Sequence, residues 1–83
     1  MELYDIITLD NGKDYVISKM LTYNEKDYLL LLEVDKDENL LNENLIVEKQ
    51  SDNNGDYVRD ITDEKLKQII SEKFAKMLLE DIK

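Results

Sequence analysis

The stretch Tyr28-Leu29-Leu30-Leu31-Leu32-Glu33-Val34 contains the only run of five consecutive apolar residues in the chain. Turn-forming residues border it on both sides, at residues 24–27 and in the acidic segment that begins at Asp35. A short apolar run with such borders is typical of a strand that is covered on both faces, rather than of a helix. It therefore predicts the central strand of a small sheet.

Further strand-like segments lie on either side of this run, at residues 3–9, 14–23, 45–48 and 56–61. Between the first two stands Asn11-Gly12, which predicts a type I′ hairpin because that turn needs positive φ at both central residues. We expect residues 35–44 to form an acidic loop. Short turns between successive strands favour an antiparallel meander of four to five strands, since parallel pairs need long crossovers.

The end of the chain predicts one helix that begins at Thr62, a good N-cap, with acidic residues in its first turn. Ile61 and Leu66 stand at the hydrophobic-staple positions for that cap. Apolar residues then recur at helical spacing and form one stripe: Leu66, Ile69, Ile70, Phe74, Met77, Leu78 and Ile82. The predicted fold is therefore α+β, with this C-terminal helix packed on one face of the sheet.

Length and composition indicate a single domain of 83 residues, with the meander at 1–61 and the helix at 62–83. An apolar content of 42% is enough for a core, so disorder is not expected. The absence of Cys and His excludes disulfides and ordinary zinc sites. The first residues lack the features of a signal peptide, and no apolar segment approaches a membrane span, so we expect a cytoplasmic protein that does not contact the membrane.

The acidic excess lies entirely in the predicted sheet. Residues 1–61 contain 15 acidic and 6 basic side chains, whereas residues 62–83 contain 5 of each, and the net charge is −9. Such a field repels nucleic acid and favours a basic partner. The simplest interpretation is that the charge maintains solubility and discourages edge pairing. The alternative is an acidic nucleic-acid mimic that inhibits a DNA- or RNA-binding protein.

The residue inventory argues against an enzyme. Mechanisms of the Ser-His-Asp and Cys-His types need residues that this chain lacks, and two glycines cannot build a Gly-rich phosphate loop. Asp35, Asp37 and Asn39 have the opening spacing of an EF-hand calcium loop, but Leu40 stands where Gly is required. A second loop, residues 52–56, fails at the same position. We expect both to be solvated turns, with no metal, cofactor or small-molecule substrate.

Both faces of the predicted sheet carry apolar side chains, more than one helix can cover. In one interpretation a curved sheet covers the second face itself. In the other, that face meets a protein partner or a second copy of the chain as a homodimer. We therefore predict a small non-catalytic protein that acts through protein–protein contact or self-association. The candidate interaction face is formed by Tyr15, Ile17, Leu21, Tyr23, Tyr28 and Leu30.

The order of these segments resembles that of the YrzB-like family, domain-of-unknown-function family 1292. Residues 6–12 are similar to its opening strand and turn, and residues 23–35 are similar to its middle hairpin. Leu45-Ile46-Val47 and a closing helix with Phe74 and Leu78-Leu79 complete the order. The C-terminal helix departs from the family by being charge-balanced. The resemblance implies a small, acidic, bacterial and intracellular protein, and it implies no activity and no site residue.

Overall fold

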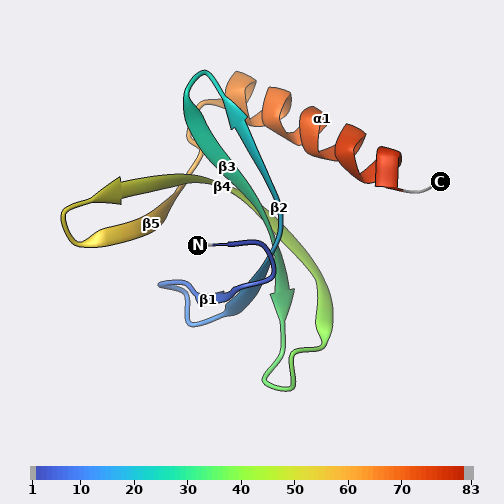
Figure 1. Ribbon diagram of the computed structural model, residues 1–83. Coiled ribbons are helices and arrows are strands. Elements are labelled where there is room, and N and C mark those ends of the chain that lie inside the picture. The colour runs from blue at the N-terminus through green and yellow to red at the C-terminus, as the bar shows by residue number, and fades with distance from the viewer. Residues whose placement is uncertain (1, 82–83) are drawn as a thin grey trace.

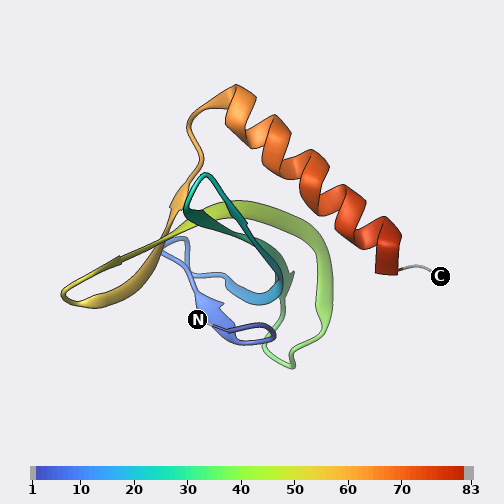
Figure 2. The same cartoon turned by 45° about the horizontal axis from the view of Figure 1, so that its top comes forward.

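The computed structural model describes residues 2–81, which form one antiparallel sheet and one helix (Figure 1). The elements are β1 (Ile6–Thr8), β2 (Asp14–Tyr23), β3 (Lys26–Val34), β4 (Leu40–Asp52), β5 (Gly55–Asp60) and α1 (Glu64–Asp81). The strands follow one another in the order β1-β2-β3-β4-β5, each antiparallel to its neighbours. The predicted α+β meander is confirmed, and the sheet is strongly curled (Figure 2).

Strand β4 is far longer than predicted, and the acidic loop before it is correspondingly shorter. It begins at Leu40 rather than Leu45, because its first half pairs with the end of β3 at Val34 and Leu32. Residues 40–44 are exposed, so the polar side chains of residues 42–44 reach water while the backbone is still hydrogen-bonded in the sheet. Leu40 and Leu41 are exposed with them. At the other end of the sheet, β1 is limited to three residues because residues 2–5 form a turn.

The type I′ turn lies in a different hairpin from the one predicted. After β1, Gly12 alone has positive φ, and the loop is closed by hydrogen bonds from the Gly12 N–H to the Leu9 carbonyl and from the Leu9 N–H to the Lys13 carbonyl. This is the three-residue hairpin loop with glycine in the left-handed region. The two-residue turn with positive φ at both centres is Asn24-Glu25, between β2 and β3.

A β-bulge at Ser18 changes the face of the sheet to which the apolar side chains of β2 point. Ile17 pairs with Leu31, but Lys19 pairs with Leu30, so one extra residue of β2 is accommodated there. Because side chains alternate along a strand, the extra residue reverses the phase of everything that follows it. The prediction that Tyr15, Ile17, Leu21 and Tyr23 lie on one face is therefore wrong.

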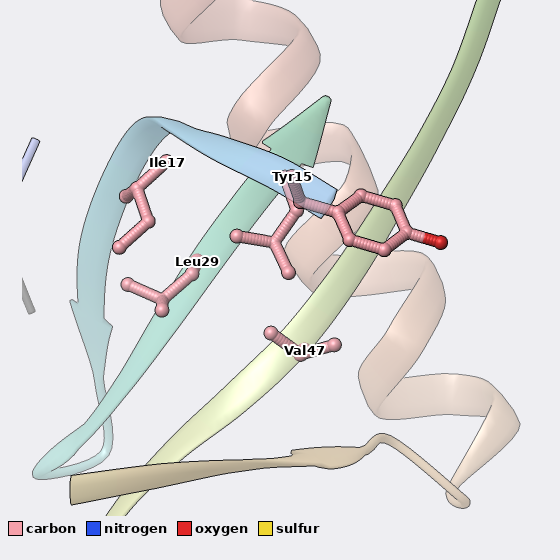
Figure 3. Close-up of a cluster of buried hydrophobic side chains, with 5 residues drawn as sticks. Tyr15, Ile17, Leu29 and Val47 are labelled. Atoms are coloured by element: carbon pink, nitrogen blue, oxygen red, sulfur yellow. The ribbon is translucent and has the colours of Figure 1, made fainter. Parts of the chain in front are cut away.

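The face of the sheet opposite the helix holds the inner cluster, formed by Tyr15, Ile17, Leu29, Leu31 and Val47 (Figure 3). Partly buried apolar residues from β1 and β5 also pack against it, among them Ile7 and Val58. Both edge strands thus contribute to the same cluster because the sheet curls toward this face. The curled sheet covers its second face itself, as one of the two interpretations expected.

The other face holds the helix-side cluster, formed by Tyr28, Leu30, Ile61, Ile70 and Phe74. The stripe of α1 is confirmed in its middle, with Leu66 and Met77 packed at the border of the cluster. Ile69 and Leu78 are 38% and 41% exposed, and Ile82 lies outside the described residues. Burial raises the pKa of the Tyr28 hydroxyl, and the neighbouring Glu48 carboxylate raises it further. The Lys73 ammonium lies 5.1 Å from the centre of the Tyr23 ring, a cation–π contact between helix and sheet.

The helix is capped by Asp63, one residue later than predicted. One carboxylate oxygen of Asp63 accepts hydrogen bonds from the N–H groups of Lys65 and Leu66, at 3.0 and 3.2 Å. The first helical backbone bond runs from the Lys67 N–H to the Asp63 carbonyl. Both Thr and Asp are good caps, and here Asp63 makes the capping hydrogen bonds. Ile61 consequently stands two residues before the cap, not at the staple position.

Candidate functional site

The six residues of the predicted interaction face do not form one exposed surface. Tyr15 and Ile17 are buried in the inner cluster, Tyr28 and Leu30 are buried in the helix-side cluster, and Leu21 and Tyr23 pack against the latter. The bulge at Ser18 and the curling of the sheet account for this separation. An aspartate in place of Tyr15 or Tyr28 would therefore destabilise the fold rather than only block a contact.

An apolar groove lies instead on the helix side of the sheet, beyond the area that α1 covers. Along β3, the side chains of Tyr28, Leu30, Leu32 and Val34 point to this same face. Tyr28 and Leu30 are covered by the helix, whereas Leu32 and Val34 lie beyond it and form the floor of the groove. The groove has a volume of about 370 Å³ and is lined by Tyr4, Ile6, Val16, Ser18, Leu32, Val34, Glu38 and Leu40.

The rim of the groove carries unusually exposed apolar side chains. The exposed fraction is 74% for Tyr4, 64% for Leu40 and 41% for Ile6. These residues come from three separate segments, namely the turn before β1, β1 itself and the first residue of β4. Six of the eight lining residues are apolar, and Glu38 is the single carboxylate among them. Such a surface can bind apolar side chains but offers few polar groups for chemistry.

The turn before β1 holds Tyr4 in a strained conformation. Its φ is +71°, in the left-handed region that bulky residues rarely adopt. Surrounding hydrogen bonds fix this geometry: the Tyr4 N–H donates to the Ile17 carbonyl at 2.7 Å, and the Ile17 N–H donates to the Asp5 carbonyl at 2.9 Å. The Asp5 carboxylate also accepts a hydrogen bond from the Glu2 N–H. The backbone therefore positions the Tyr4 ring at the rim of the groove and keeps it exposed.

A larger hollow of about 710 Å³ lies on the opposite side of the sheet, between the loop after β1 and the edge strand β5. Its floor belongs to the inner cluster, but its rim is polar and includes Asp10, Asp56, Arg59 and Asp60. The Ser51 hydroxyl donates a hydrogen bond to Asp56 and lowers the pKa of that carboxyl, and Lys49, 3.8 Å away, lowers it further. The Asp56 carboxylate of this rim thus already takes part in contacts within the sheet.

The first of the two calcium-like sequences forms a capped turn. One carboxylate oxygen of Asp35 accepts hydrogen bonds from the backbone N–H groups of Asp37 and Asn39, both at 2.9 Å. These backbone bonds, that of Asn39 first, lower the pKa of the Asp35 carboxyl. Glu38 closes the turn with φ of +64° and borders the groove. Within residues 2–81, no group of three or more acidic side chains is arranged to hold a metal ion.

Sequence reasoning missed the groove residues, although part of the signal was present. The row from Tyr28 to Val34 was identified, but a sequence does not tell how far along that row a helix extends. Leu40 was assigned to a loop, and the exposed Leu41 that follows it does not line the groove. No sequence pattern marks Tyr4 as a residue with positive φ.

Comparison with family models, with curated proteins and with solved structures gave no match. The resemblance to the YrzB-like family therefore stays a prediction from the residues that support it. In the described part of the chain, no helix is long and apolar enough to cross a membrane.

Proposed function

We propose that this protein is non-catalytic and acts by binding another protein through the apolar groove. The observation that carries the proposal is the exposure of Tyr4, Ile6 and Leu40 around a groove whose lining is mostly apolar. Clustered apolar exposure on a small domain is typical of a contact surface, whereas scattered exposed residues are not. A partner that fills the groove would remove this surface from water, at about 25 cal/mol for each Å² of apolar area.

The conformation of Tyr4 is a second support for the proposal. A bulky residue in the left-handed region costs on the order of 1–3 kcal/mol, and such strain is concentrated at functional positions. Tyrosine is also enriched at protein interfaces, because its ring buries a large area and its hydroxyl can stay hydrated. The turn at residues 2–5 thus places a favourable contact residue where folding alone gains nothing from it.

The test is a pull-down from lysate of the native host with tagged protein, at low and high salt, read by mass spectrometry. We compare Leu40→Glu with the matched control Leu41→Glu, which adds the same charge one residue away and outside the groove. The proposal expects a protein that is retained at high salt by the natural chain and by Leu41→Glu, but lost with Leu40→Glu. A partner that still binds Leu40→Glu but is lost at high salt would refute binding through the groove and support the nucleic-acid mimic instead.

A further inference from the structure

The C-terminal half of α1 carries a second apolar surface, which extends from the edge of the buried stripe to the side that faces away from the sheet. Ala75, Leu78 and Leu79 are exposed, with Leu79 at 70%. Their spacing of three and four residues places them next to one another on the helix surface. Leu79 follows the buried Ile70 by nine residues, which is about two and a half turns, so the two side chains point in opposite directions. We name Ala75, Leu78 and Leu79 the helix strip.

Among residues 2–81, the helix strip is part of neither hydrophobic cluster. The helix-side cluster uses Leu66, Ile70, Phe74 and Met77. Ala75 and Leu79 lie on the far side of α1, and Leu78, one turn after Phe74, lies at the edge between the two surfaces. Both views of the fold place the C-terminal end of α1 far from β1, whose residue Ile6 lines the groove (Figures 1 and 2). One molecule therefore presents two separate apolar surfaces, a groove and a convex helical strip, and it does not bring them together.

The charge distribution decides which surfaces of two copies can meet. Residues 1–61 carry the entire net charge of −9, whereas residues 62–83 are neutral, with 5 acidic and 5 basic side chains. Contact between the sheets of two copies would bring two strongly negative surfaces together, which costs free energy. The helix segment has no net charge, so it is the part of a second copy that meets the acidic sheet with the least repulsion.

We infer that the groove binds the helix strip of a second copy of this chain. An amphipathic helix laid in an apolar groove is a common mode of recognition, and α1 already covers Tyr28 and Leu30 of the same β3 row in this manner. Reciprocal docking about a twofold axis would close a dimer with two identical groove–strip contacts, and this closed form is the one that we infer. The inference rests on the proposed function, since it names the partner of the same groove.

Sedimentation equilibrium of the purified full chain tests the inference, over about 1 µM to 1 mM, the range expected for a small interface. As its concentration rises, the apparent mass of the natural chain should increase from 9.8 kDa toward twice that value. Leu40→Glu in the groove and Leu79→Glu in the strip should each raise the dissociation constant at least about tenfold. The controls Leu41→Glu and Ile69→Glu, at exposed positions outside both surfaces, should associate like the natural chain. Circular dichroism checks that each variant is folded.

Mixing the two weakened variants gives the decisive result. A Leu40→Glu chain retains its strip and a Leu79→Glu chain retains its groove, so an equimolar mixture regains one intact contact. The mixture should therefore associate more strongly than either variant alone. A natural chain that stays monomeric, a Leu79→Glu variant that associates normally, or a mixture no stronger than its components would each overturn the inference. The proposed function would still stand if Leu40→Glu lost a different protein in the pull-down.

Discussion

Replacing Phe74 by Ala tests how α1 is held on the sheet. Phe74 is 1% exposed and packs among Tyr28, Leu30, Ile61 and Ile70. Removing a buried phenyl ring and leaving its cavity costs about 3–5 kcal/mol. A domain of this length has a free energy of unfolding of about 4–12 kcal/mol, so the loss is a large fraction of the total. At about 4–8 °C for each kcal/mol, the melting temperature should fall by at least about 12 °C.

The assay is urea unfolding followed by circular dichroism, with Leu78→Ala as the matched control. Leu78 lies one turn further along α1 and is 41% exposed, so its truncation should cost less than about 1 kcal/mol. An equal dependence of the free energy of unfolding on urea concentration would show that both variants unfold from a similar folded state. The reasoning is refuted if Phe74→Ala is no less stable than Leu78→Ala, because the helix would then not be anchored through this ring.

Three further predictions concern the turns and the helix cap. Glu25→Gly should raise the free energy of unfolding by about 1 kcal/mol, because Glu25 has φ of +66° in a type I′ turn where Asn-Gly is preferred; an unchanged urea midpoint would contradict this. Asp63→Ala should lower the free energy of unfolding by about 1 kcal/mol because the helix loses its cap, whereas Asp63→Ser should largely preserve that free energy. The Asp35 carboxyl has a lowered pKa in the folded protein, so its stabilising effect is present above the ordinary pKa and is lost as pH falls through the folded value. The free energy of unfolding of Asp35→Ala should consequently fall less steeply below about pH 4 than that of the natural chain. Acid titrations of the two proteins, run in parallel, would test this difference.

The bulge at Ser18 has the widest consequences among the features that sequence reasoning did not foresee. It places Tyr15 and Ile17 in the inner cluster and turns Leu21 and Tyr23 toward the helix, so one strand contributes to both cores. A regular β2 would have left one face rich in apolar residues and the other poor. The candidate interaction face assumed this regularity, and that is why its residues are in fact interior.

The sequence by itself determined the elements and their order. Turn residues, the apolar run at 28–34 and the helical spacing from Leu66 to Met77 are local signals, so they predicted an antiparallel meander and a C-terminal helix. Only the tertiary structure decided which apolar residues remain exposed. That outcome depends on the Ser18 bulge, on β4 pairing from Leu40 onward, and on α1 stopping short of Leu32 and Val34. Each of these follows from contacts between residues far apart in the chain, whose energies no local pattern contains.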